Sequence, residues 1–394
     1  MLSLSKHKRI KLILILLLSL NDSIFPNGKI FLKMINGMSL FNSTTYLKIK
    51  PFSKLFNDTN KNSTILIFEP NTYHHECTPG FSKYFLELGY NVDILINLIG
   101  IDSFSLFQDI EKISLYTFNN LSEIMENSKI LSSVIKKYDF VLLQTTDKNK
   151  KNIYANLDLL NINTSIFVFH DVRYINYGYL DYLNQSRVWT LGNFPIGLRI
   201  NPHYFGNIKL KDKGDKTIFF MTSTPRRNYN YLVESVKRLK QENYNFEIII
   251  TGRTTAFNQK RIPTNLINNF KFKQKVSYSE LYKLIDNSDY IIILIDLSNK
   301  YGKEYKTIKV SGSIQLTYGF LKPALIHKEF SEFYNLDEKN SLIYNNANLY
   351  NIMRKAILLN KKEYKEIQNN LRIIENKIHL TSINNIQKVI KKIN

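Results

Sequence analysis

The chain alternates short, solidly apolar runs with longer stretches of helical periodicity, and this alternation restricts the folds open to it. Apolar runs without polar alternation are typical of parallel strands covered by helices on both faces. The pattern therefore predicts an α/β fold built from βαβ units. The predicted strands are Thr64–Phe68, Val92–Asn97, Phe140–Gln144, Ser165–Phe169, Arg187–Leu191, Thr217–Met221, Phe246–Ile250, Tyr290–Ile295, Ala324–His327 and Leu342–Tyr344.

These strands form two sets, and the break between them spans residues 193–215. Proline and glycine punctuate the break, as is typical of a domain linker. The residues concerned are Pro195, Gly197, Pro202, Gly206 and Gly214. A chain of 394 residues also suits two domains better than one core. We therefore expect two doubly wound, Rossmann-like domains. The predicted segments are an N-terminal extension 1–55, a first domain 56–205, a second domain 206–377 and an amphipathic terminal helix 378–394.

The net charge of +21 is concentrated at the ends of the chain. Residues 1–55 hold nine Lys and Arg against one Asp, and residues 351–394 hold ten against three Glu. The 295 residues between them carry only +6. This distribution does not indicate a basic groove, so we expect no nucleic-acid partner. The single cysteine, Cys77, excludes a disulfide framework and fits a reducing compartment.

The N-terminal extension combines a basic cluster, residues 6–11, with an aliphatic run, residues 12–20. The run is too short to span a bilayer, and no small-residue cleavage site follows it. A second apolar patch at residues 30–35 is flanked by lysine. This pattern predicts attachment of residues 1–35 to an anionic membrane surface, and hence a cytoplasmic protein on the inner face of the plasma membrane. A helix packed on the domain surface and a signal peptide are the alternatives.

The sequence lacks the motifs of several common cofactor-, nucleotide- and metal-binding sites. There is no G-x-G-x-x-G after a strand, no G-x-x-x-x-G-K-[ST], no H-E-x-x-H and no C-x-x-C. Asp-x-Asp, a metal-holding pair, is also absent. We therefore expect no cofactor and no catalytic metal. In doubly wound domains ligands bind beyond the carboxyl ends of the strands, so the residues that follow each strand are the candidates.

Two loops of the first domain carry candidate catalytic residues. The loop after the first strand contains His75 and Glu76, which could be presented to a substrate hydroxyl. His170 and Asp171 follow the fourth strand, where an imidazole can bind a hydroxyl or accept its proton. The alternatives are polar loop residues without a role and a buried, hydrogen-bonded histidine.

The second domain has candidate phosphate-binding residues after three of its strands. Arginines, hydroxyls and free amides at helix starts all bind phosphate. The candidates are Thr222, Ser223, Arg226, Arg227, Gly252, Arg253, Ser311, Gly312 and Ser313. This set predicts a bound nucleoside diphosphate.

The order of these motifs resembles the GT-B glycosyltransferases, in particular the family-1/family-4-type bacterial enzymes. His170-Asp171 is similar to the family's His-Asp after a strand of its first domain, and Pro195-Ile196-Gly197 is similar to its interdomain segment. Val276 with the two residues after it resembles the base-contacting turn, and 312–315 resembles the segment that binds the donor ribose. The family's paired glutamates are missing, and Gln315 stands near the second position.

The resemblance implies two domains that face each other across a cleft, with the last helix crossing back to the first. Residues 56–205 would bind the acceptor, and residues 206–377 would bind a nucleoside-diphosphate sugar. It adds Val276 and Gln315 to the donor-binding residues. The implied activity is metal-independent transfer of a sugar to a glycan or lipid-linked acceptor, with retention or inversion left open. A polyol-phosphate transferase and a non-catalytic sugar-nucleotide or glycan-binding subunit are the alternatives.

Deletion of residues 1–25 should release the protein from anionic vesicles, because it removes the basic cluster and the aliphatic run together. Each basic residue near an anionic surface contributes about 1 kcal/mol. Cosedimentation with anionic and neutral vesicles measures the effect, and high salt should weaken binding of the full chain. Equal pelleting of both forms would assign the extension to packing instead.

Overall fold

The computed structural model describes most of the chain from residue 48 onward. The described ranges are 48–57, 64–108, 112–147, 149–176, 185–224, 227, 229–252, 257, 260, 262–298 and 300–393. The predicted membrane-binding segment, residues 1–35, lies outside these ranges. No helix of the described chain is both long enough and apolar enough to span a bilayer.

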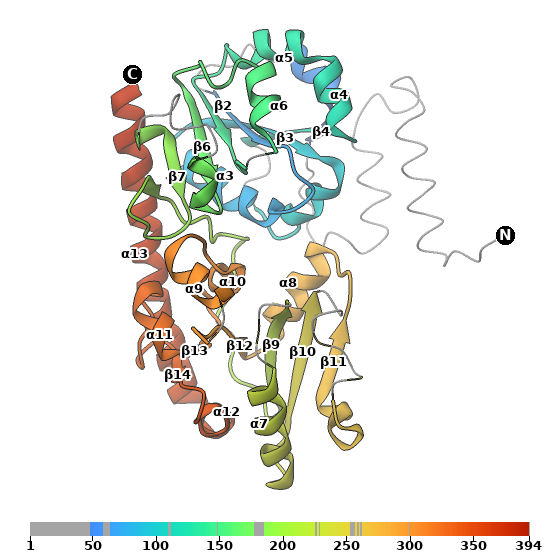
Figure 1. The fold of residues 1–394 in the computed structure, drawn as a ribbon, viewed down its shortest axis with the longest axis vertical. Coiled ribbons are helices and arrows are strands. Elements are labelled where there is room, and N and C mark those ends of the chain that lie inside the picture. The colour runs from blue at the N-terminus through green and yellow to red at the C-terminus, as the bar shows by residue number, and fades with distance from the viewer. Residues whose placement is uncertain are drawn as a thin grey trace, which may run out of the picture.

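The first domain is built on a parallel sheet in the order β1-β4-β3-β2-β5-β6-β7-β8 (Figure 1). Its strands are β1 (Lys48–Pro51), β2 (Thr64–Glu69), β3 (Asn91–Asn97), β4 (Ile113–Phe118), β5 (Phe140–Leu143), β6 (Ser165–Phe169), β7 (Val188–Thr190) and β8 (Leu198–Arg199). Every position of β2 is buried, as expected for a strand with helices on both faces. The winding direction reverses between β2 and β5, so the loops after these two strands border the crevice where doubly wound sheets bind ligands.

Helices and short 3₁₀ turns connect these strands. They are η1 (Phe52–Phe56), η2 (His75–Cys77), α3 (Thr78–Glu87), η3 (Leu98–Phe104), α4 (Leu121–Glu126), α5 (Ser128–Ile135), α6 (Lys151–Asn156), η5 (Val172–Asn176) and η6 (Gln185–Arg187). Among them, α3 follows the loop after β2 and buries Phe81 and Phe85 against the sheet.

The second domain has a parallel sheet in the order β11-β10-β9-β12-β13-β14, with its switch point between β9 and β12. The strands are β9 (Thr217–Ser223), β10 (Phe246–Gly252), β11 (Phe270–Lys273), β12 (Tyr290–Ile293), β13 (Ala324–His327) and β14 (Leu342–Tyr344). The helices are α7 (Asn230–Gln241), η8 (Thr264–Asn269), α8 (Tyr278–Asp286), α9 (Lys300–Thr307), α10 (Gly312–Phe320), α11 (Lys328–Ser331), η9 (Glu332–Tyr334) and α12 (Leu349–Leu358). Figure 1 shows α8, α9 and α10 at the junction with the first domain.

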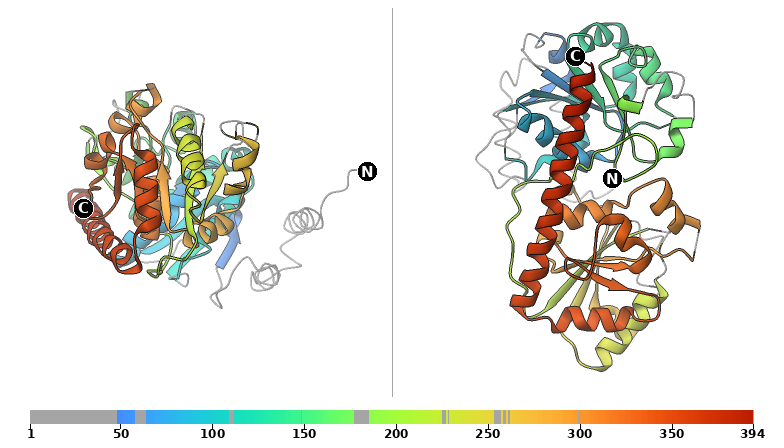
Figure 2. Two further views of the ribbon diagram at one scale, coloured as in Figure 1. Left: turned by 90° about the horizontal axis from the view of Figure 1, so that it is seen from below. Right: turned by 90° about the vertical axis from the view of Figure 1, so that its left-hand side faces the viewer.

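One long helix, α13 (Lys361–Ile393), runs along both domains (Figure 2). Leu371 and Ile378 are buried in the core of the second domain, whereas Ile386 and Val389 are buried in the core of the first. The helix thus contacts the first domain, as the resemblance implies. It begins well before residue 378 because its apolar spacing extends back through the second domain.

The prediction of two doubly wound α/β domains is confirmed, and each predicted strand position holds a strand. Among the described residues, β1, β4, β8 and β11 were not predicted. The strands β1 and β11 alternate lysine with apolar residues and lie at sheet edges, where charged side chains are expected. Two boundaries also need correction. β1 lies inside the predicted extension 1–55, and β8 lies inside the predicted break, so the linker is the segment 200–216 between β8 and β9.

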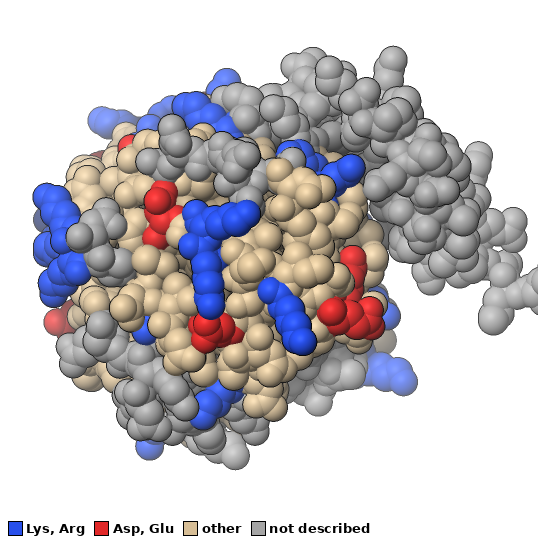
Figure 3. Space-filling model, turned by 90° about the horizontal axis from the view of Figure 1, so that it is seen from above, with Lys and Arg blue, Asp and Glu red and all other residues tan. Residues whose placement is uncertain are grey.

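Charged side chains on the outer face of the first domain are dispersed. Figure 3 shows Lys and Arg there as separate side chains, with Asp and Glu between them and uncharged residues over most of the face. The described part of this face carries no basic strip.

The linker runs so close to its neighbours that three glycines are required around it. A Cβ on Gly80 would lie 2.7 Å from the carbonyl oxygen of Pro202, and one on Gly206 would lie 2.1 Å from that of Leu106. A Cβ on Gly319 of α10 would lie 2.1 Å from the carbonyl oxygen of His203. The linker is therefore held against both domains by direct backbone contact.

Gly319→Ala should destabilise the protein because its Cβ cannot fit unless the linker backbone moves. Overpacking of this kind lowers the free energy of unfolding by about 1–3 kcal/mol. Urea unfolding measures the change. Gly214→Ala is the matched control, because its Cβ would make only an ordinary contact at 3.5 Å. Equal stability of the two variants would contradict the close packing.

Candidate functional site

A buried carboxyl group organises the loops at the switch point of the first domain. Glu69 ends β2 and is completely buried. Its Oε1 accepts a hydrogen bond from the Asn71 amide (2.8 Å). Its Oε2 accepts from Thr145 Oγ1 (2.5 Å) and Gln144 Nε2 (3.0 Å). Burial raises the pKa of Glu69 to about 7, although these hydrogen bonds oppose the shift. Glu69 therefore ties the loop after β2 to the loop after β5.

Three side chains from the loops that follow β2 and β6 form what we call the first-domain cluster: His74, Glu76 and His170. The His74 and His170 rings stack at 4.0 Å, and His74 Nδ1 lies 3.5 Å from Glu76 Oε1. His74 has a left-handed backbone with φ of 67°, which is uncommon for a residue other than glycine. The backbone carbonyl of His74 is held by Gln144 Nε2 at 2.8 Å. The loop is thus fixed at the point where it turns the His74 side chain toward His170.

The pKa values of the two stacked imidazoles are shifted in opposite directions. Burial by itself would lower the pKa of His74, but the hydrogen bond and charge of Glu76 raise it above its ordinary value. Burial, together with the charge of His74, holds the pKa of His170 well below its usual range. His170 Nε2 donates to the Gln144 carbonyl at 3.1 Å, because a carbonyl oxygen only accepts. Neutral His170 therefore keeps a lone pair on Nδ1 and can accept a proton.

Glu76 is the anionic member of the first-domain cluster. Burial would raise its pKa, but His74 and the Tyr278 hydroxyl lower it to about 2. Tyr278, the first residue of α8, donates its hydroxyl to Glu76 Oε2 at 2.8 Å. Glu76 thus contacts the second domain directly, and the pair of His74 with Glu76 lies at the domain junction.

The structure does not place His75 and Asp171 as the sequence suggested. His75 is buried, its Nε2 donates to the Asn71 carbonyl at 2.7 Å, and its ring packs against Gly100. The histidine that reaches His170 is instead His74, which the sequence could not distinguish from its neighbour. The Asp171 carboxylate accepts two hydrogen bonds from the Arg173 guanidinium and one from the Arg173 amide. Nη1 of Arg173 also donates to Glu304 of α9 at 3.2 Å. Asp171 therefore orients an ion pair between the domains.

The second domain presents a helix start and an arginine at the same junction. Ser311 precedes α10 without capping it through its side chain. Ile314 N donates to the Ser311 carbonyl oxygen at 3.0 Å, so the amides of Gly312 and Ser313 are those that keep their capacity to bind an anion. Gly312 faces open space. Arg227 Nη2 donates to Ser311 Oγ at 3.3 Å, and its guanidinium lies over the Tyr305 ring at 5.1 Å. Arg227 Nη1 is buried without a hydrogen-bond partner among the described residues.

The other predicted donor-binding residues contribute to different degrees. Thr222 Oγ1 lies 3.1 Å from Ser313 Oγ, which joins the end of β9 to the start of α10. Gly252 has φ of 103°, and a Cβ there would lie 2.8 Å from the Ser223 carbonyl oxygen. Gly252 and Ser223 thus shape the ends of neighbouring strands. Val276 is half-buried just before α8. Arg226 and Arg253 lie outside the described residues.

Gln315 of α10 contacts the first domain beside the first-domain cluster. Its Oε1 accepts a weak hydrogen bond from Cys77 Sγ at 3.9 Å, and its Nε2 is buried without a partner among the described residues. Cys77 follows Glu76, and Gln315 follows the open start of α10 by one turn. The first-domain cluster and the start of α10 therefore lie on opposite sides of one junction.

A hollow of about 650 Å³ lies elsewhere, beside α13, and contains none of the predicted residues. Its lining includes Arg199, Asp337 and Lys377, without any grouping that suggests a reaction. At the junction itself, the contact of Glu76 with Tyr278 bridges the domains. We place the candidate site there because the titratable groups and open amides converge at that point.

No protein-family profile matches the sequence, and no curated protein matches it as a relative. Among solved structures, the chain aligns with the glycosyltransferase VinC in complex with DTDP (11% identity, 84% of this chain and 100% of that one, TM-score 0.45). It also aligns with HepE of Anabaena in complex with UDP and glucose (11% identity, 84% and 100%, TM-score 0.48). A mutant of the Thermobaculum terrenum O-GlcNAc transferase aligns over 85% of this chain and 68% of its own (6% identity, TM-score 0.47).

Glu69→Gln should remove part of the pH dependence of stability. Because the folded protein raises the pKa of Glu69 from 4.5 to about 7, the protonated carboxyl group stabilises the fold below pH 4.5. This contribution, roughly 3 kcal/mol, is lost as the pH rises through 7. The fall in unfolding temperature between pH 5 and pH 8 should therefore be smaller for Glu69→Gln than for the wild type.

Glu126→Gln, at an exposed glutamate of α4, is the control and should follow the wild-type pH profile. If all three proteins lose the same stability between pH 5 and pH 8, Glu69 does not titrate in this range.

Proposed function

We propose that the protein is a glycosyltransferase that moves a sugar from a nucleoside-diphosphate sugar to an acceptor hydroxyl. The observation that carries the proposal is the junction itself. A neutral imidazole beside a charged His–Glu pair lies across from an arginine and an open helix start. The first group suits removal of a proton, and the second suits a diphosphate leaving group.

The second domain would bind the donor. Arg227 and the first-turn amides of α10 would neutralise the charge that develops on the diphosphate as the sugar leaves. Arginine binds phosphate oxygens bidentately, and the buried Nη1 of Arg227 has a donor to offer. This arrangement does not need a divalent metal ion in the transfer step, so we propose metal-independent transfer.

The first domain would bind and activate the acceptor. His170 would accept the proton of the attacking hydroxyl on Nδ1, because its low pKa keeps it neutral and its Nε2 is held by the Gln144 carbonyl. Glu76 would keep His74 protonated, and the charge of His74 would orient the hydroxyls of the sugar or the acceptor. Glu69 would position the loops that carry these groups.

Substrate entry would require the domains to separate. The contacts of Glu76 with Tyr278, Asp102 with the Ser279 amide and Arg173 with Glu304 all cross the junction. Each of these contacts joins one residue of the first domain to one residue of the second, so the contacts would break on opening and form again on closure. Closure around the donor would exclude water and limit hydrolysis of the sugar nucleotide.

The acceptor would be lipid-linked or a growing glycan at the cytoplasmic face of the membrane, in synthesis of a cell-surface polysaccharide. The sequence of residues 1–35 supports this part of the proposal, because its basic and apolar residues suit an anionic surface.

Arg227→Ala and His170→Ala should separate the two halves of the reaction. Calorimetry with a panel of nucleoside diphosphates first identifies the one that binds. Arg227→Ala should weaken its binding by about 1.5–3 kcal/mol, the range for charge-assisted hydrogen bonds. His170→Ala should retain this affinity but lower turnover of the matching sugar nucleotide by about 10²-fold or more.

Arg354→Ala is the control, because this exposed arginine contacts Tyr244 on the far side of the second domain. It should bind and turn over like the wild type. Absence of binding to every nucleoside diphosphate, or unchanged affinity of Arg227→Ala, would reject the donor site. Normal turnover by His170→Ala would reject the proposed base.

A further inference from the structure

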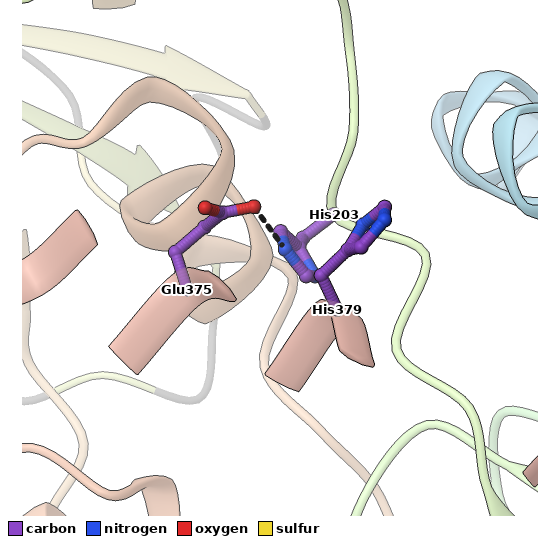
Figure 4. A group of neighbouring side chains, drawn as sticks. All are labelled: His203, Glu375 and His379. Atoms are coloured by element: carbon purple, nitrogen blue, oxygen red, sulfur yellow. Dashed lines mark hydrogen bonds and ion pairs between the residues drawn. The ribbon is translucent and has the colours of Figure 1, made fainter. Parts of the chain in front are cut away.

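A second group of metal-ligating side chains lies at the hinge, apart from the candidate active site. His203 of the linker meets Glu375 and His379 of α13 (Figure 4). One ligand atom from each of these residues lies within 4.8 Å of the others. Glu375 and His379 are one helical turn apart, which places them on the same face of α13. The group sits near the carboxyl end of α10, since the His203 backbone packs on Gly319, whereas the candidate donor site uses the amino end.

The hydrogen bonds of His203 leave its Nε2 facing the Glu375 carboxylate. Its Nδ1 lies 2.9 Å from the Asn201 carbonyl and must donate, because a carbonyl oxygen only accepts. Its Nε2 points at Glu375 Oε1 at 2.9 Å. His203 is buried, with 1% of its side chain exposed. Nε2 of His203 therefore either donates a proton to the Glu375 carboxylate or, together with that carboxylate, binds a metal ion.

A bound metal ion satisfies this arrangement. Histidine ligands of metals bind through one ring nitrogen and donate the other N–H to a backbone carbonyl or a carboxylate. His203 has this arrangement through Asn201, and His379 has it through Glu87, whose Oε2 lies 2.7 Å from His379 Nε2. Two imidazoles and one carboxylate form a ligand set typical of Zn²⁺. The two carboxylates, Glu375 and Glu87, also balance the charge of a divalent ion.

The site has room and access. A hollow of about 350 Å³ opens beside it and is lined by His203 and Glu375. Glu375 and His379 expose 22% and 19% of their side chains, so an ion can enter from solvent. Ligand atoms of tetrahedral Zn²⁺ lie about 3.3 Å apart, so side-chain adjustment of roughly 1–1.5 Å completes the site.

We propose that His203, Glu375 and His379 bind one Zn²⁺ ion that fastens the linker to α13. Both segments cross from one domain to the other, so the ion would join the two connections at the hinge. Its role is structural and does not involve the transfer step.

Zinc binding to the full-length protein tests the proposal. After removal of metal by a chelator, the wild type should bind one Zn²⁺ per chain in competition with a chromophoric chelator. Glu375→Gln and His379→Gln should each weaken this binding at least about 10-fold. Glu366→Gln, at an exposed glutamate of the same helix, should bind like the wild type. The substituted side chains are partly or fully exposed, so circular dichroism without metal should show that all variants fold.

A second measurement addresses the effect on the fold. Zn²⁺ should raise the unfolding temperature of the wild type and of Glu366→Gln, but not of the two ligand variants, because a ligand stabilises only the state that binds it. Absence of saturable Zn²⁺ binding by the wild type, or equal affinity of all four proteins, would overturn the proposal. Neither outcome depends on nucleotide binding, so the proposed function stands or falls separately.

Discussion

The close backbone contact of the linker with both domains is the constraint on which the rest of the structure depends. Glycine at 80, 206 and 319 allows the linker to lie directly against α3, the segment after η3 and α10. Because α13 packs on the linker through the Asn201 amide and Ser382 Oγ (3.1 Å), both connections between the domains are held together. This placement brings the carboxyl edge of the first sheet to the start of α10. Without it, the first-domain cluster would not face α10 and Arg227.

Within this frame, burial sets the chemistry of the first domain. Glu69 lies in the core of the switch point, where loss of solvent raises its pKa and three donors hold its oxygens. The same loss of solvent lowers the pKa of His170, while the hydrogen bond and charge of Glu76 raise the pKa of His74. Two stacked imidazoles 4.0 Å apart therefore have pKa values shifted in opposite directions. Such a difference between neighbouring groups is characteristic of acid–base sites.

The candidate anion site of the second domain consists of backbone amides as well as side-chain charge. The open amides of α10 and a single described arginine, Arg227, lie together at the junction. Helix amides are fixed by the fold, so they require no reorganisation when charge develops on a ligand. The hinge group of His203, Glu375 and His379 relies on the same rigidity, because α13 fixes the spacing of two of its ligands.

The sequence by itself determined the α/β class, the two domains and the positions of ten strands, because solid apolar runs have few other places in a fold. It also predicted His170, Glu76, Arg227 and the start of α10 as site residues, since these follow strands, and the structure brings them to the domain junction. It missed β1 and β11, whose alternating lysines reflect edge positions that only the sheet order defines. Only the tertiary structure decided between His74 and His75, because a left-handed backbone at His74 directs one ring to His170 and leaves the other in the core. It alone also revealed Glu69, whose altered pKa arises from burial among residues distant in the chain, and the hinge group, in which His203 lies 172 residues before Glu375.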